Sequence, residues 1–268
     1  MDLIAAALLG VVQGLTEFLP VSSSGHLILA RAFFGWDAER FGLAFDVACH
    51  VGTLLAVVLF FRRDVQAMLA AIPGALRMGR GEYERLVRLI VVGTLPVVAV
   101  GLLFGDWLEG VRSPAVVAVT LALGGLGLIA AERLGSRSRD SSSIGYGEAV
   151  AIGFAQAAAL VPGVSRSGAT LTLAMLLGLS RDRAARFVFL LSLPAVLAAA
   201  AREALKLRDV GVAGIPVTLF AVGLVVSAVV GYLTIKFFLK YLANHSLAVF
   251  AYYRFALAAV TVWWLATR

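Results

Sequence analysis

A short stretch near the start of this sequence carries side chains that acid–base or phosphoryl-transfer chemistry would use. Gln13 and Glu17 stand four residues apart, so they share one helix face if the helix continues almost to Pro20. Pro20 ends that helix, because its ring clashes with the preceding turn and its nitrogen has no hydrogen. Ser23 and His26 would lie three residues apart on a second helix, close enough to interact. A carboxylate, a hydroxyl and an imidazole are the groups of nucleophilic or acid–base catalysis.

The break around Pro20 has two interpretations. Because it is polar and lies between apolar runs, it suits a re-entrant hairpin whose irregular backbone is buried in protein or faces water. Ser22 or Ser23 would then cap the second helix, and the free N–H groups at the start of that helix would bind an anion. The alternative is a surface loop between two ordinary helices, in which the polar residues only cap. This stretch alone favours neither interpretation.

Composition places the whole chain in a membrane. Of the 268 residues, 61% are hydrophobic and 15% are charged, whereas soluble domains are about 45–50% apolar. We therefore predict an all-α polytopic membrane protein with six transmembrane helices and two re-entrant helical hairpins, at about 1–34 and 147–178. The crossings are expected at about 43–61, 87–105, 114–131, 187–201, 214–235 and 247–265. The net charge of +7 includes no basic run interleaved with aromatics, so no nucleic-acid partner is expected.

The two halves of the chain match at their polar interruptions. An offset of 143 residues aligns Gln13 with Gln156, and the same offset aligns several serines and glycines of the two breaks. We expect a single integral membrane domain, 1–268, made of two repeats at about 1–135 and 144–268. Each repeat supplies one hairpin and three crossings. Because three is odd, the second repeat must be inverted, and the two hairpin tips would meet within the membrane.

Basic residues are divided unequally between the two ends of the predicted crossings. One end collects 14 of the 23 lysines and arginines and the other collects 7, while Arg166 and Arg254 lie inside predicted membrane segments. The positive-inside rule therefore places the Arg-rich segment 62–88 in the cytoplasm and both chain termini outside.

The second interruption, residues 162–170, would complete a phosphate cradle, and Ser165 would cap the helix that follows it. Arg166 aligns with Ser23, and its guanidinium suits a bidentate phosphate contact. The hydroxyls expected to bind phosphate are those of Ser22, Ser24, Ser165, Ser167 and Thr170. The alternative, that Arg166 only anchors the chain at a membrane edge, does not account for its alignment with Ser23. Gln13 and Glu17 would help to hold Mg²⁺ or Ca²⁺ through oxygen ligands and bridging phosphate oxygens.

These motifs resemble those of the undecaprenyl-diphosphate phosphatase (bacitracin-resistance) family of bacterial membrane enzymes. Gln13 and Glu17 match (E/Q)-x-x-x-E, residues 22–26 match S-S-x-G-H, and residues 162–170 match P-G-x-S-R-S-x-x-T. The resemblance implies hydrolysis of undecaprenyl diphosphate to undecaprenyl phosphate and inorganic phosphate, which recycles the lipid carrier for cell-wall synthesis in the bacterial inner membrane. It also implies divalent-metal dependence, although Gln13 in place of Glu leaves one carboxylate fewer for the metal.

Several alternatives stay open at this point. A polyprenyl-phosphate or anion transporter would use the same cradle without hydrolysis, because broken helices in inverted repeats are also transporter architecture. A pure carrier would not need Glu17, Ser23 and His26, so the phosphatase is preferred. Within it we favour Ser23 as the nucleophile or as the residue that positions it, His26 as the proton-transfer group and Arg166 as the stabiliser of phosphoryl charge. Attack by water, the lipid chain length, the metal and a homodimer are left open.

Three further polar residues lie within predicted crossings. Asp46 and His50 are four residues apart on one helix face and would either support the site or serve in packing. For Arg254 the favoured interpretation is an interior ion pair.

Overall fold

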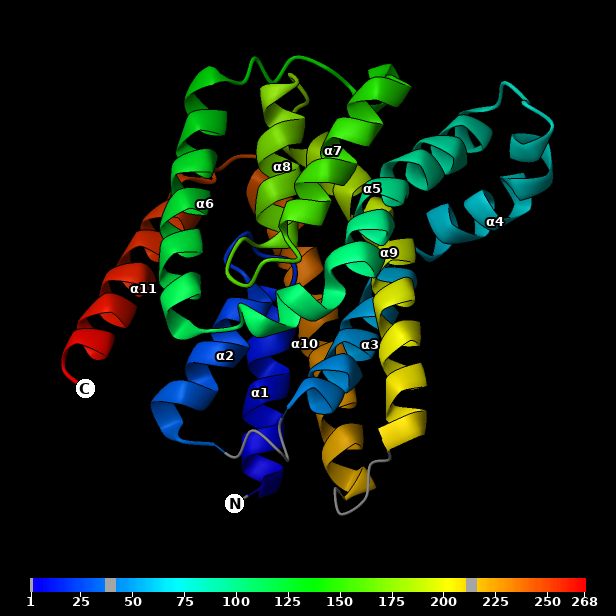
Figure 1. Ribbon diagram of the computed structural model, residues 1–268. Helices are drawn as coiled ribbons and strands as arrows, with labels where there is room; N and C mark the ends of the chain where they lie inside the picture. The colour runs from blue at the N-terminus through cyan, green and yellow to red at the C-terminus, as the bar shows by residue number, and fades with distance from the viewer. Residues whose placement is uncertain (1, 37–41, 211–215) are drawn as a thin grey trace.

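The computed structural model describes residues 2–36, 42–210 and 216–268, and these ranges are helical apart from turns and one isolated β-bridge between Arg139 and Leu179. Five helices are long and apolar enough to cross a membrane, or six if the bent pair α3–α4 counts as one span. The prediction of an all-α polytopic membrane protein is therefore confirmed, while the number of crossings stays a prediction. In Figure 1, α6, α9 and α10 run roughly upright, α4, α5 and α11 are tilted, and both chain termini lie toward one end.

Six helices are long, and α9 is the most deeply buried of the five apolar spans among the described residues. The bounds of the six are α3 Leu43–Phe60, α5 Glu82–Gly110, α6 Pro114–Leu134, α9 Arg181–Val210, α10 Val217–Leu242 and α11 Ala248–Ala266. Helix α9 is longer at both ends than the crossing expected at 187–201, because it also includes charged turns at each end of the apolar run. Helix α4 (Arg62–Leu76) follows α3 at an angle of 85° and lies at the end opposite the termini, where the Arg-rich segment was expected not to cross (Figure 1).

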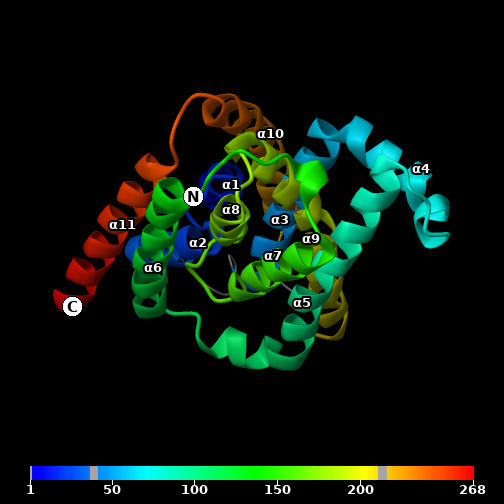
Figure 2. The ribbon, with the colours of Figure 1, turned by 90° about the horizontal axis from the view of Figure 1, so that it is seen from above.

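Two pairs of shorter helices fill the middle of the molecule. The first pair is α1 (Asp2–Thr16) and α2 (Ser23–Phe34), and the second is α7 (Tyr146–Ala158) and α8 (Arg166–Leu176), preceded by a short 3₁₀ turn, η1 (Ser141–Ser143). Each pair enters from one end, turns near mid-height and returns, and the two pairs enter from opposite ends (Figure 1). From above, these helices lie between α6 and α11 on one side and α3, α5 and α9 on the other (Figure 2).

The turn at each tip depends on an unusual backbone conformation of one serine. Ser22 and Ser165 have positive φ values of 76° and 71°, a region that residues other than glycine rarely occupy. Each serine side chain accepts a hydrogen bond from the N–H three residues later, at Gly25 and Gly168 respectively. Both serines are therefore N-caps, as the sequence predicted.

Helix α1 ends earlier than the sequence predicted. Its last helical residue is Thr16, whereas the sequence suggested a helix continuing almost to Pro20. The reason is that the residue before a proline is pushed out of the helical region, so the chain must leave the helix upstream. Glu17 still donates its backbone N–H to Gln13 at 2.9 Å, and the side chains of the two residues share a face as expected.

The first helix of each pair packs closely against one long helix. Gly14 of α1 leaves no room for a side chain, since a Cβ there would come within 2.7 Å of Val230 on α10. Gly153 of α7 lies in the same way against the backbone of Gly93 on α5, where a Cβ would come within 2.2 Å of the carbonyl oxygen. Small residues at these contacts let the helix backbones approach. The correspondence is compatible with two repeats, which stay a prediction.

Candidate functional site

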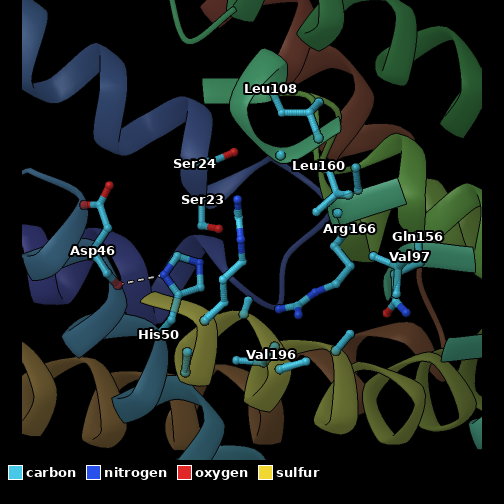
Figure 3. A pocket seen from close by; sticks show the side chains of 18 of the residues that line it. Ser23, Ser24, Asp46, His50, Val97, Leu108, Gln156, Leu160, Arg166 and Val196 are labelled. Carbon is cyan, nitrogen blue, oxygen red and sulfur yellow. Dashed lines mark hydrogen bonds between the residues drawn. The ribbon is translucent and has the colours of Figure 1, made fainter. Parts of the chain in front are cut away.

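A cavity of about 340 Å³ lies where the two tips meet. Its walls come from both tips, from the first half of α3, from α5 and from α9, and Figure 3 shows it from close by. Most of the wall is apolar. The polar side chains in the lining are Glu17, Ser22, Ser23, Ser24, Asp46, His50, Arg112, Gln156, Ser165, Arg166 and Arg202.

Glu17 is the centre of the polar network. It is only 7% exposed, and its Oε1 forms an ion pair with Arg166 from the second tip. Its Oε2 accepts hydrogen bonds from Ser23 Oγ at 2.7 Å and from Gln13 Nε2 at 2.8 Å. His50 Nε2 on α3 lies 3.5 Å from the same oxygen. The structure therefore brings together three of the predicted catalytic residues, Glu17, Ser23 and Arg166.

Ser23 and Arg166 occupy equivalent places at the start of two helices. Ser23 is the first residue of α2, and Arg166 is the first residue of α8. The N–H groups of a first helical turn have no partner within the helix, and the helix dipole is positive there. Two such helix starts beside one guanidinium make this end of the cavity suited to a polyanion such as a diphosphate.

The five serine and threonine residues expected to bind phosphate divide into two groups. Ser22, Ser24 and Ser165 line the cavity. Ser167 and Thr170 do not belong to its lining, and both hydroxyls donate to backbone carbonyls. Ser167 Oγ bonds to Leu19 O at 3.0 Å, and Thr170 Oγ1 bonds to Arg166 O at 2.7 Å. Their contacts hold the tips in shape, and nothing in the geometry places them against a ligand.

The structure does not bring His26 to Ser23. His26 Nδ1 lies 2.7 Å from Ser22 O, and because a carbonyl can only accept, this nitrogen carries the hydrogen. In the neutral ring, His26 Nε2 is then the acceptor for the Tyr253 hydroxyl, at 2.6 Å. The ring lies nearly parallel to that of Tyr253 on α11, with the centroids 5.6 Å apart, and does not line the cavity. Its lone pair is therefore occupied by Tyr253.

The histidine that lies beside Glu17 is His50 of α3, which the sequence suggested only as a residue supporting the site or serving in packing. Its Nδ1 donates to Asp46 O at 2.7 Å, the interaction drawn in Figure 3, which leaves Nε2 directed at Glu17. The Asp46 carboxylate forms a bidentate pair with Arg31, at 2.7 and 2.8 Å, and lies 3.4 Å from Arg112. Asp46 and His50 therefore support the site, which is one of the two alternatives that their spacing allowed.

Arg254 holds the two tips together from behind. It is fully buried, and its guanidinium donates to carbonyl oxygens of both tips, at Pro20 and at Gly163 and Val164, with distances of 3.0–3.2 Å. It also donates to carbonyls of Thr120 and Leu121 on α6, both at 3.0 Å. The expected interior ion pair is therefore wrong, because five carbonyls replace a carboxylate. The sequence carried only one signal of this role, a permanent charge at membrane depth.

The residues near Glu17 do not fit a resident metal ion. Within the described residues, no three side chains of His, Cys, Asp or Glu lie together as a metal site would require. Both Glu17 oxygens already have partners, and Gln13 turns its amide nitrogen toward Glu17 and does not line the cavity. The buried Gln13 Oε1 has no hydrogen-bond partner, but a single amide oxygen is not a site for Mg²⁺ or Ca²⁺.

Comparisons with known proteins show the family to which the chain belongs. A family model described as bacitracin resistance protein BacA matches residues 6–260. An undecaprenyl-diphosphatase of Rubrobacter xylanophilus is 53% identical over 264 residues, which is 97% of each chain. Proteins of the same name from Alcanivorax borkumensis and Moorella thermoacetica are each 43% identical, and the matches cover 99% of this chain and at least 99% of theirs. The chain therefore belongs to the bacitracin resistance protein BacA family.

Proposed function

We propose that this protein is a membrane phosphatase that hydrolyses undecaprenyl diphosphate to undecaprenyl phosphate and inorganic phosphate. This reaction recycles the lipid carrier for cell-wall synthesis. We propose that the same hydrolysis gives the resistance to bacitracin for which the family is named. The observation that carries the proposal is the meeting of Glu17, Ser23 and Arg166 at two helix starts inside one cavity. The names of the family and of its relatives support the same activity.

Ser23 is placed to act as the nucleophile in this proposal. Its Oγ attacks the terminal phosphorus, the bond from that phosphorus to the bridging oxygen breaks, and undecaprenyl phosphate leaves. The hydroxyl proton passes to Glu17 along the existing 2.7 Å hydrogen bond. Water then hydrolyses the phosphoserine and releases inorganic phosphate. Glu17 takes the role first expected of His26, because the His26 lone pair is occupied by Tyr253.

Arg166 and the helix starts supply charge stabilisation. A phosphoryl transition state spreads negative charge over the peripheral oxygens, and fixed donors aimed at them lower the barrier without reorganising. The guanidinium has five donors, so it can keep its contact with Glu17 and still offer N–H groups to the substrate. A pure anion carrier would gain nothing from a serine bonded to a buried carboxylate.

The apolar part of the cavity suits the lipid. Val97, Leu102, Leu108, Leu160 and Val196 face the cavity together with the polar cluster, so a polyprenyl chain and a diphosphate can be bound side by side. We propose the bacterial inner membrane as the location, with the cavity opening on the outer side. We further propose that a divalent ion enters the site bound to the oxygens of the diphosphate. The homodimer stays a prediction.

Reconstitution of the purified protein in vesicles tests the function. We expect release of inorganic phosphate from undecaprenyl diphosphate, and from farnesyl diphosphate as a short analogue, at a rate proportional to the protein added. A carrier would instead move the labelled lipid phosphate between leaflets with no release of inorganic phosphate, and that result would replace the phosphatase by a transporter.

A further inference from the structure

The side-chain amide of Gln156 is buried, and neither its nitrogen nor its oxygen has a hydrogen-bond partner. It lies in the last turn of α7, is 1% exposed and lines the cavity together with Glu17 and Arg166. Among the described residues, the buried side-chain polar atoms without a hydrogen bond are Gln13 Oε1 and both terminal atoms of Gln156. Burying an amide in this way is costly unless something else satisfies it.

Packing within the protein does not account for this side chain. The aligned residue of the first half, Gln13, uses its amide nitrogen to bind Glu17. The position equivalent to Glu17 in the second half is Leu160, which cannot accept a hydrogen bond. Gln156 therefore has no internal partner where Gln13 has one, and its amide remains available to whatever fills the cavity.

The surroundings of Gln156 indicate which part of a ligand it would meet. In Figure 3, Ser23, His50 and Asp46 lie on one side of the cavity, Gln156 lies on the other with Val97 and Leu160 close to it, and Arg166 is drawn between the two sides. A diphosphate whose terminal phosphorus is at Ser23 would place its second phosphoryl group, the one that carries the lipid, toward Gln156 and the apolar wall.

We propose that the amide of Gln156 binds the lipid-side phosphoryl group, the group that remains on the lipid after hydrolysis. The NH₂ donates to a non-bridging oxygen of that group without adding charge, and Oε1 accepts a hydrogen bond from a bound water. This inference rests on the proposed function and gives Gln156 a part in it. This contact makes the site selective for a diphosphate, because a single phosphate at Ser23 would leave the Gln156 amide without a hydrogen-bond partner.

Product inhibition of the Gln156→Leu variant tests the proposal. Leucine keeps the volume and the helix but removes the amide, so the inhibition constant of farnesyl phosphate should rise about ten- to a hundred-fold, the range for a hydrogen bond to a charged group. The inhibition constant of inorganic phosphate should stay within about two-fold of wild type. Ser227→Ala is the matched control, since Ser227 is a buried polar residue outside the cavity lining, bonded to Cys49 O at 2.9 Å. It should change neither constant.

Two results would overturn the assignment. A rise for inorganic phosphate without one for farnesyl phosphate would place Gln156 at the terminal phosphoryl group. No change in either constant, with or without a loss of thermal stability, would make the residue structural. Direct binding of farnesyl phosphate to the wild-type and variant proteins gives the same comparison without turnover. If the wild type releases no phosphate, the proposed function is wrong. If the wild type is active and the Gln156→Leu variant has unchanged inhibition constants, only this inference is wrong.

Discussion

Arg166 forms an ion pair with Glu17, which lies 149 residues earlier in the chain. One residue begins α8 in the second hairpin and the other follows α1 in the first, so the pair exists only when the tips meet. An unpaired charge at this depth would be expensive, and each residue removes that cost for the other. The contact that completes the candidate site is therefore also a contact that joins the two halves.

Ser23→Ala separates covalent from direct hydrolysis. If Ser23 is the nucleophile, its loss should lower kcat on the order of 10⁴-fold or more. If Ser23 only donates a hydrogen bond to attacking water or phosphate, the loss should be on the order of 10²–10³-fold. We expect the larger effect. Acid quenching with substrate labelled in the terminal phosphate should also trap label on serine, and the absence of label in both the wild type and a slow His26→Ala variant would favour attack by water.

His26 should act through Tyr253 and not directly on the substrate. The Tyr253 hydroxyl donates to its Nε2 at 2.6 Å, while Nδ1 supports the tip through Ser22 O at 2.7 Å. His26→Ala and Tyr253→Phe should therefore be non-additive, with the double variant losing little more kcat than His26→Ala alone. Measured kcat values for the three proteins decide this. Losses that add in full would show that His26 works independently of Tyr253, as a proton-transfer group would.

Metal dependence should appear only with substrate. The family resemblance predicts that EDTA stops phosphate release and that Mg²⁺ or Ca²⁺ restores it. Glu17 has both oxygens occupied, so we expect calorimetry to detect no micromolar binding of either ion to the substrate-free protein. Tight binding without substrate, lost in Glu17→Gln, would show a resident site after all. Full activity in EDTA would show that phosphate release needs no divalent metal.

Orientation in the membrane can be measured with single cysteines. In a Cys49→Ala background, Met78→Cys lies in the exposed connection after α4, and Thr267→Cys lies at the exposed C-terminal end. The imbalance of 14 basic residues against 7 predicts that an impermeant thiol reagent labels the cysteine at 267 in intact cells and reaches the one at 78 only after permeabilisation. Asp37, an alternative outer position, lies outside the described residues. Labelling in the reverse pattern would invert the topology.

Sequence reasoning located both tips, because polar, proline-broken segments are conspicuous in a chain with this much apolar sequence. It also predicted the caps correctly, since Ser22 and Ser165 are capping residues placed directly before short helices. These are local features, determined by residue type and by neighbours along the chain.

The features of the site that could not be predicted from the sequence depend on tertiary contacts. Spacing places Ser23 and His26 on one helical turn, but the contacts of each side chain depend on residues of α11 and α3 that pack against this turn. Tyr253 binds His26, and His50 approaches Glu17 from 33 residues further along the chain. The role of Arg254 was hidden for the same reason, because its acceptors are backbone carbonyls that leave no mark in the sequence. The partnerless state of Gln156 likewise follows only from its burial.

Phosphate release by Glu17→Gln and Arg166→Ala tests the central claim most directly. The matched control is Arg139→Ala, which removes an ion pair of comparable form, Arg139 with Glu148 at 2.6 Å, outside the cavity lining. With undecaprenyl diphosphate as substrate, we expect both site variants to lose about 10³-fold or more in kcat/KM while remaining folded in detergent, and Arg139→Ala to keep near-normal turnover. Arg166→Lys should also fail, because an ammonium lacks the planar fork of the guanidinium. Near-normal turnover in either Glu17→Gln or Arg166→Ala would contradict the assignment of this cavity as the active site.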